Sequence, residues 1–270
     1  MENPVRRIGS AVAVLCLAVP ALAACGSTSA PAASTSAGAT TAASPTITGT
    51  INVFAASSLQ EAFTTLGQQF ETAHPGVKVV FNFAASSDLA TQITQGAPAD
   101  VFASASAKNM TQVTTAGYAG APTMFAKNVM EIAIPPANPG KVSVLADLAK
   151  AGVKLAVCQS QVPCGATAAT VFKNAGLTVK PVTLEPDVKS VLGKVELGEV
   201  DAGVVYVTDV RAAGSKVTGI KIPDAVNAST SYPIAALTKS GNSATAHAFV
   251  AFVLSAAGST VLTTDGFAKP

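Results

Sequence analysis

The stretch Ile51-Asn52-Val53-Phe54-Ala55-Ala56-Ser57-Ser58-Leu59 decides the fold, because it joins a short apolar run to the start of an amphipathic one. Residues 51–54 predict a β-strand. The apolar side chains that follow recur at the spacing of one helical face: Leu59, Ala62, Phe63, Leu66 and Phe70. His74-Pro75-Gly76 predicts the end of this helix. The first unit of the chain is therefore a strand, two serines and a helix.

The same alternation continues to the end of the chain. Further strands are predicted at 77–83, 99–103, 128–134, 154–157, 202–207, 216–222 and 232–238. Further helices are predicted at 88–95, 108–116, 144–150, 166–174, 189–197, 244–254 and 259–262. Alternating strands and helices indicate an α/β fold with parallel strands and helices on both faces of the sheet. In such folds, ligands bind where the carboxyl ends of strands meet the starts of helices.

Four predicted helices begin with residues that offer hydroxyl or backbone N–H donors. They begin at Ala55-Ala56-Ser57-Ser58, Ala84-Ala85-Ser86-Ser87, Pro163-Cys164-Gly165 and Asp187-Val188. Unpaired N–H groups and the positive end of the helix dipole attract anions. An alternative remains open for each serine, because Ser58 with Glu61 also fits a capping box and Ser86 or Ser87 an N-cap. The repetition favours an anion site.

The N-terminus predicts export and anchoring. Arg6 and Arg7 precede an apolar run that ends in Leu22-Ala23-Ala24-Cys25. A basic start, a short apolar segment and small residues at the cut are typical of a secretory signal, here residues 1–24. The ending resembles the bacterial lipobox, which implies a lipid on Cys25 and a location on the outer face of the cytoplasmic membrane. The alternatives are a secreted protein with an incidental cysteine and an uncleaved anchor.

The composition limits the classes of partner. Residues 25–46 are almost entirely Ser, Thr, Ala, Pro and Gly, which predicts a disordered tether. Without residues 1–24, 15 basic and 14 acidic residues remain, a balance that argues against a nucleic-acid partner. An aromatic content of 5% with no Trp offers little stacking surface for sugars or bases. We expect a monomer.

The cysteines take different roles according to position. Cys16 lies in the signal and Cys25 is the lipidation candidate, which leaves Cys158 and Cys164. In an oxidising compartment this pair predicts a disulfide. A metal or redox site is the alternative, but His74 and His247 both lie far from the pair in the sequence.

Several motifs together resemble the molybdate-binding proteins of ABC importers. They are Val53 to Leu59, Phe83-Ala84-Ala85-Ser86-Ser87-Asp88-Leu89, Gln95-Gly96-Ala97-Pro98-Ala99-Asp100-Val101-Phe102, Val162-Pro163-Cys164-Gly165, Gly203-Val204-Val205-Tyr206, Tyr232-Pro233-Ile234 and Asp265-Gly266-Phe267. The resemblance covers nearly all of residues 47–270. It implies a type II periplasmic-binding-protein fold of two lobes, each a mixed sheet flanked by helices, joined by two crossovers. Lobe I is expected at 47–127 with 231–270, and lobe II at 128–230.

The resemblance also implies the ligand contacts, at Ser58, Ser86, Cys164, Val188 and Tyr206. Hydroxyl and backbone N–H groups at these positions would bind molybdate or tungstate as an oxyanion, with no protein–metal bond and no cofactor. Cys164 stands where many relatives have a small residue, and a bridge to Cys158 would brace its loop. A membrane permease is the implied partner.

Three alternatives to this function remain. The first is a receptor for sulfate, phosphate or another small oxyanion. The second is a surface serine hydrolase, which needs a base close to its serine; His74 ends a predicted helix, His247 lies within another, and no Gly-x-Ser-x-Gly motif is present. The third is a purely structural lipoprotein.

Overall fold

The computed structural model describes residues 47–270. The predicted signal at 1–24, the lipidation at Cys25 and the tether at 25–46 lie outside these described residues. Everything that follows concerns the described part of the chain.

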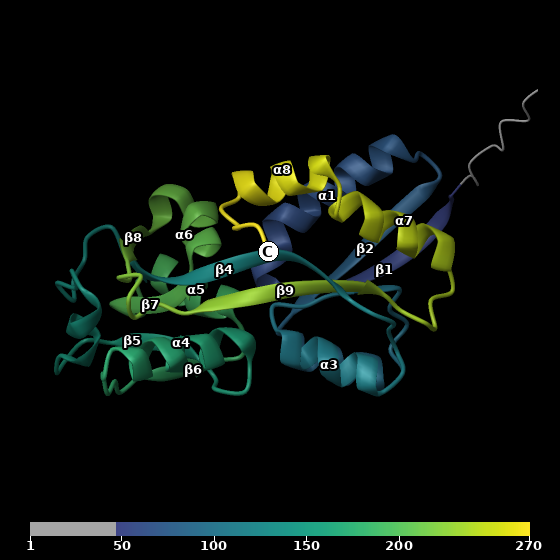
Figure 1. Cartoon of the computed structure of the whole chain (residues 1–270). Coiled ribbons are helices and arrows are strands. Elements are labelled where there is room, and N and C mark those ends of the chain that lie inside the picture. Colours follow the sequence, from purple (N-terminus) through teal and green to yellow (C-terminus); the bar gives the residue numbers. More distant parts are fainter. Residues whose placement is uncertain (1–46) are drawn as a thin grey trace, which may run out of the picture. The chain divides into compact units, whose positions relative to one another are not determined.

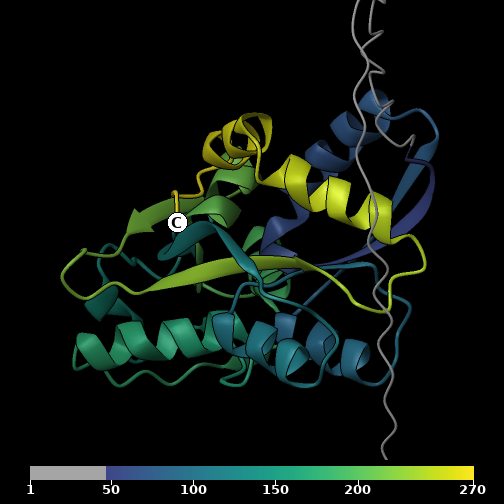
Figure 2. The same cartoon turned by 45° about the vertical axis from the view of Figure 1, so that its right-hand side comes forward.

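Three parallel strands and one antiparallel strand build the first half of the sheet, in the order β2-β1-β3-β9. These strands are β1 (Gly49–Ala56), β2 (Val77–Ala84), β3 (Val101–Ala103) and β9 (Ser229–Ala236). The helices of this half are α1 (Gln60–Ala73), preceded by the 3-10 turn η1 (Ser57–Leu59), α2 (Ser86–Thr94), α3 (Ala107–Thr115), α7 (Ser243–Val253) and α8 (Ala256–Thr264). Helices α1, α7 and α8 cover one face of the sheet, whereas α3 lies on the other (Figures 1 and 2).

The second half repeats this design with five strands. Strands β7, β5 and β6 run parallel, and β4 pairs antiparallel with both β7 and β8. The strands are β4 (Thr123–Ile134), β5 (Leu155–Cys158), β6 (Thr183–Glu185), β7 (Ala202–Tyr206) and β8 (Thr218–Lys221). The helices are α4 (Pro163–Asn174), α5 (Val188–Glu196) and α6 (Val207–Ala213), with short 3-10 turns η2 (Leu145–Ala149) and η3 (Gly214–Lys216).

Strands β4 and β9 connect the two halves and make the sheet continuous (Figure 1). Residues 123–129 of β4 pair with β9, whereas residues 130–134 pair with β7 and β8. The chain therefore crosses between the halves twice, once along β4 and once into β9. We call the half with β1–β3, α1–α3, α7 and α8 lobe I, and the half with β5–β8 and α4–α6 lobe II. The predicted residue limits of the lobes stay a prediction.

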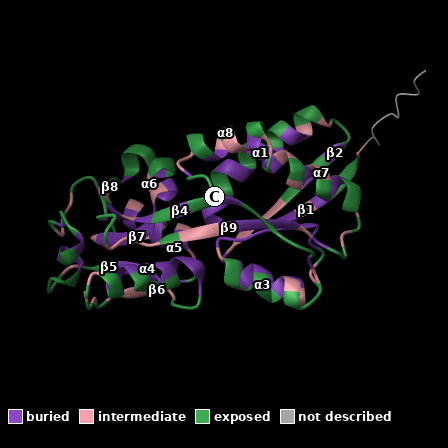
Figure 3. Ribbon diagram, in the orientation of Figure 1, coloured by how far each residue is buried: buried purple, intermediate pink, exposed green. Residues whose placement is uncertain are grey.

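Each lobe has its own apolar core. In lobe I, one cluster lies under α1 and α7 around Phe63 and Phe249, and a second lies under α2 and α3 around Phe102. The core of lobe II is drawn from residues 130–222, with Ala85 as the single contribution from outside this range. The strands are mostly buried and the outer faces of the helices exposed (Figure 3). Separate cores allow each lobe to keep its structure when the lobes move relative to each other.

The α/β prediction is confirmed, and the differences are local. Strand β4 begins at Thr123, five residues before the predicted 128. The prediction missed these residues because a bulge between Met124 and Ala126 interrupts the two-residue alternation. The predicted helix at 144–150 is the 3-10 turn η2. Strand β6 was not predicted because its three residues, Thr183–Glu185, contain no apolar run. Helix α6 was also missed, because it follows β7 without any intervening turn residue.

Among residues 47–270, no single helix is long and apolar enough to cross a membrane; α7 and α8 meet the length and composition requirement only as a pair, bent by 59°.

Candidate ligand-binding site

A small cavity lies between the two lobes, at the carboxyl ends of their strands. Its walls are small and mostly apolar: Ala56, Ser57, Ser58, Ala84, Ala85, Ser86, Ala105, Pro163, Cys164, Asp187, Val188 and Tyr206. All five predicted ligand residues are in this set, and all five are buried. Ser58 and Ser86 come from lobe I, whereas Cys164, Val188 and Tyr206 come from lobe II. The fold therefore brings together residues that are up to 148 positions apart.

Ser58 lies on η1 and is held by a partner from β9. Its Oγ is 2.9 Å from Oη of Tyr232. Burial raises the pKa of Tyr232, so the phenol stays protonated and can donate this bond. The hydroxyl proton of Ser58 is then available to a ligand. The capping-box alternative is wrong, because the N-cap of α1 is Leu59 and no side chain bonds there.

Ser86 begins α2 and is fully buried. Its Oγ accepts a hydrogen bond of 2.9 Å from the backbone N–H of Ala105. Because this bond occupies a lone pair, the hydroxyl proton is available to a ligand in the cavity. The N-cap alternative is also wrong, since Ala85 holds the N-cap position of α2 and no side-chain oxygen bonds there.

Cys164 lies in the first turn of α4, and a disulfide joins it to Cys158 at the end of β5. This bridge confirms the predicted pairing. Pro163 begins the helix, where its lack of an N–H is harmless. Position 165 must be glycine, because a Cβ on Gly165 would lie 1.9 Å from the carbonyl oxygen of Gln159. The disulfide and this close approach fix the turn that presents the N–H of Cys164.

Asp187 caps α5 and leaves one donor of that helix unused. Its Oδ1 accepts hydrogen bonds from the N–H groups of Lys189 at 2.8 Å and Ser190 at 3.1 Å. The first N–H group of a helix has no acceptor in its own helix. Val188 carries that first N–H and lines the cavity. The cap therefore consumes the second and third donors and leaves the first for a ligand.

Tyr206 ends β7, and its side chain gives the strongest indication of what the cavity binds. The residue is 1% exposed, and its Oη has no hydrogen-bond partner among the described residues. Burial raises the pKa of the phenol well above its ordinary value, so the group is a neutral donor. A buried polar group without a partner destabilises a protein by about 1–3 kcal/mol. Such an atom in the wall of a cavity indicates that a ligand supplies the missing acceptor.

The cavity offers donors and almost no free acceptor. Oδ2 of Asp187 accepts a third hydrogen bond, from Oγ of Ser190, so both carboxylate oxygens of this residue are in use. No Lys or Arg is in the described wall. Across residues 47–270, no three His, Cys, Asp or Glu side chains gather as metal ligands. The site is therefore suited to a negatively charged ligand bound through neutral hydrogen-bond donors.

The two histidines lie away from this cavity. His74 ends α1, and its ring packs 4.6 Å from that of Phe70. His247 is an exposed residue of α7 and lines a different hollow. Neither is in the wall that carries Ser58 and Ser86, so neither serine has an imidazole base beside it.

Comparison with known proteins gives the family. The family model described as bacterial extracellular solute-binding protein matches residues 51–268. This chain belongs to that family. The molybdate-binding protein ModA of Mycobacterium tuberculosis is 46% identical to this solute-binding protein over 258 residues, which cover 95% of this chain and 96% of the relative.

Solved structures share the fold of this solute-binding protein. The periplasmic molybdate-binding protein of Azotobacter vinelandii superposes with a TM-score of 0.71 at 21% identity, covering 82% of this chain and 99% of that one. The sulfate-binding protein SubI of Mycobacterium tuberculosis gives a TM-score of 0.73 at 16% identity, covering 82% and 86%. At these identities the two structures support the type II fold and not the choice of anion.

Three residues that support the site of this solute-binding protein were not predicted as functional. Tyr232 holds Ser58, Ala105 binds Ser86 through its backbone, and Asp187 caps the helix of Val188. Asp187 had a signal as an acidic residue at the start of a predicted helix, and Tyr232 belongs to a motif that carries the family resemblance, although neither was assigned a role. The contacts of Tyr232 and Ala105 depend on how distant strands pack together.

Proposed function

We propose that this solute-binding protein captures molybdate, and also tungstate, outside the cytoplasm and delivers it to the permease of an ABC importer. The observation that carries the proposal is the unpartnered Oη of Tyr206, buried in a cavity that is also lined by the hydroxyl groups of Ser58 and Ser86. The molybdate-binding relative that aligns with 95% of the chain supports the choice of anion.

The chemistry of the donors favours a fully deprotonated tetrahedral anion. Five donors are available: the hydroxyls of Ser58, Ser86 and Tyr206 and the N–H groups of Cys164 and Val188. Hydrogen bonds to a charged group contribute about 1.5–3 kcal/mol each. After the loss of translational and rotational freedom is deducted, several such bonds are sufficient for micromolar to nanomolar affinity, about −8 to −12 kcal/mol.

The same donors discriminate against protonated anions. Oγ of Ser58 and Oγ of Ser86 each have a lone pair engaged by a partner within the protein. A hydrogen phosphate ion brings an O–H group, and Asp187, the one carboxylate in the described wall, already accepts hydrogen bonds at both oxygens, which lowers the affinity for that ion. Sulfate lacks that proton and must be excluded by size, because it is smaller than molybdate. Sulfate is therefore expected to compete with molybdate more strongly than hydrogen phosphate does.

Isothermal titration calorimetry tests the proposal. We expect heat of binding with molybdate and tungstate in the micromolar range or tighter, weaker binding of sulfate, and none of hydrogen phosphate at the same concentrations. Sulfate binding tighter than molybdate would contradict the choice of anion. The absence of binding by all four anions would contradict the function itself and favour a structural lipoprotein.

We further propose that residues 1–24 are removed as a signal, that Cys25 carries the lipid and that residues 25–46 tether a monomeric binding domain to the outer face of the membrane. The predicted lobes, 47–127 with 231–270 and 128–230, would close around the anion as two bodies. Detergent phase partitioning of the wild type and of Cys25→Ala tests the anchor. The wild type is expected in the detergent phase and the variant in the aqueous phase; equal partitioning would contradict lipidation.

A further inference from the structure

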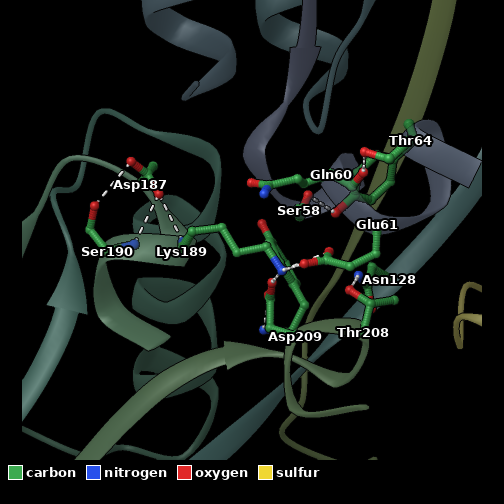
Figure 4. A network of polar contacts seen from close by, with 12 residues as sticks. Ser58, Gln60, Glu61, Thr64, Asn128, Asp187, Lys189, Ser190, Thr208 and Asp209 are labelled. Carbon is green, nitrogen blue, oxygen red and sulfur yellow. Dashed lines mark hydrogen bonds and ion pairs between the residues drawn. The ribbon is translucent and has the colours of Figure 1, made fainter. Parts of the chain in front are cut away.

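A second set of residues follows directly behind three of the ligand residues. Glu61 lies three positions after Ser58, Lys189 directly follows Val188, and Asp209 lies three positions after Tyr206. Their side chains meet at the amino group of Lys189, as Figure 4 shows. Nζ of Lys189 lies 2.9 and 2.8 Å from the two carboxylate oxygens of Glu61 and 3.1 Å from Oδ1 of Asp209.

One of these ion pairs joins the two lobes. Glu61 is on α1 of lobe I, whereas Lys189 on α5 and Asp209 on α6 belong to lobe II. The other ion pairs recorded among residues 47–270 all lie within lobe II. In the described part of the chain, the pair between Lys189 and Glu61 is therefore the one ionic contact across the cleft.

On the lobe II side, Lys189 already has an ion-pair partner in its own lobe, Asp209. The side chain of Asp209 is 0% exposed, and its Oδ2 accepts a hydrogen bond of 3.0 Å from the N–H of Tyr206. Burial lowers the pKa of Lys189, but the charges of Asp209 and Glu61 outweigh this effect and raise it overall. The amine is therefore charged, and its pairing with Asp209 does not depend on lobe closure, since both residues are in lobe II.

The lobe I side is free to separate. The side chain of Glu61 is 44% exposed, so its carboxylate can return to water when the lobes part. A partly exposed ion pair contributes modestly, changing an equilibrium constant by up to about fivefold in typical measurements. A contribution of this size cannot hold the lobes closed by itself, but it is added to the hydrogen bonds that the anion makes to both lobes.

We propose that Glu61 and Lys189 form an interlobe latch, which closes when the lobes meet over the bound anion and slows the release of that anion. The inference rests on the proposed function, because the latch adjoins the same cavity. Glu61 and Lys189 act as positioning residues, since neither is in the wall of the cavity. Because Lys189 follows Val188 directly, the latch also fixes the helix start that presents the N–H of Val188.

The test compares Glu61→Gln with Glu199→Gln. Each substitution removes the charge of a carboxylate that pairs with a lysine of α5, at 2.8 Å for Glu61 and 2.9 Å for Glu199. The side chains of Glu61 and Glu199 are similarly exposed, at 44% and 51%. Glu199 pairs with Lys194, however, and both of these residues lie in lobe II. The second variant is therefore a matched control for loss of an ion pair without loss of the latch.

The first measurement is the dissociation rate of molybdate by stopped flow. Glu61→Gln is expected to release molybdate faster than the wild type by up to about fivefold, and the difference is expected to shrink at high salt because the pair is partly exposed. Glu199→Gln is expected to release it at the wild-type rate. Urea unfolding of the ligand-free proteins should show the same stability for both variants. Equal dissociation rates for all three proteins would overturn the proposal.

The second measurement does not need a ligand. Spin labels carried by an unnatural amino acid at positions 108 on α3 and 173 on α4, both exposed, report the distance between the lobes. Without molybdate, Glu61→Gln is expected to show a smaller closed population than the wild type and Glu199→Gln. Identical distributions would overturn the latch even if the wild type bound no anion, whereas the absence of binding by the wild type would contradict only the proposed function.

Discussion

Replacing Tyr206 with Phe removes one oxygen atom, which is buried in the cavity and has no partner among the described residues. The ring keeps its place in the core of lobe II, so the substitution leaves no large void. In the ligand-bound protein we expect the lost atom to be a donor to a charged oxygen. In this structure it is a buried group without a hydrogen bond among the described residues.

The substitution is expected to change molybdate affinity and the stability of the ligand-free protein in opposite directions. A hydrogen bond to an anion contributes about 1.5–3 kcal/mol, which corresponds to an affinity loss of about 10- to 150-fold. A buried hydroxyl without a partner destabilises the fold, so its removal should raise the free energy of unfolding of the ligand-free protein by about 1 kcal/mol. Tyr206→Phe should therefore bind molybdate more weakly and yet be more stable.

Tyr232→Phe is the matched control. It removes a phenolic oxygen that is also buried but lies 2.9 Å from Oγ of Ser58. This variant should lose about 1 kcal/mol of stability, because a satisfied hydrogen bond is broken. Calorimetry with molybdate and urea unfolding without ligand measure both quantities. An affinity of Tyr206→Phe within twofold of the wild type, or a loss of stability as large as that of Tyr232→Phe, would refute the reasoning.

Three further outcomes are expected. Ser86→Ala should lower both affinity and stability, the latter by about 1–3 kcal/mol, because the buried N–H of Ala105 loses its acceptor; calorimetry and urea unfolding measure the two, and an unchanged stability would contradict this role. Replacing Cys158 and Cys164 with Ser should lower stability by about 2–2.5 kcal/mol on the loop-entropy model and also weaken molybdate binding; equal affinity would show that the bridge supports only the fold. Burial raises the pKa of Asp209 to about 6, so the folded protein binds a proton there at a pH at which the unfolded chain does not. Its contribution to stability therefore falls as the pH rises from about 4 through 6, by on the order of 3 kcal/mol, and urea unfolding of Asp209→Asn should lack this dependence; parallel pH profiles would contradict the assignment.

Local patterns in the sequence were sufficient for most of the fold. Apolar side chains at helical spacing from Leu59 to Phe70 predicted α1, because one face of that helix must be buried against the sheet. The failures occurred where the local pattern is short or interrupted. Strand β6 has three residues, α6 follows β7 without a turn, and the bulge near Met124 hides the first part of β4.

The sequence alone did not distinguish a capping serine from a ligand-binding serine. Both roles place a hydroxyl at the start of a helix, so the local sequence is the same. The tertiary structure excludes the capping role at Ser58 and Ser86. Oγ of Ser58 pairs with Oη of Tyr232 and Oγ of Ser86 accepts from the N–H of Ala105, so neither hydroxyl caps its own helix, and ligand binding at both stays a proposal.

By itself, the sequence determined the alternation of strands and helices, the disulfide partners and, through family resemblance, the five residues around the cavity. Only the tertiary structure showed that Tyr206 is buried without a partner and that Lys189 reaches Glu61 across the cleft. The physical reason is sequence distance. Periodicity and capping act over a few residues, whereas Ser58 and Tyr232 are 174 positions apart and Glu61 and Lys189 are 128 apart. Contacts of this kind exist only once segments that are distant in the sequence pack together.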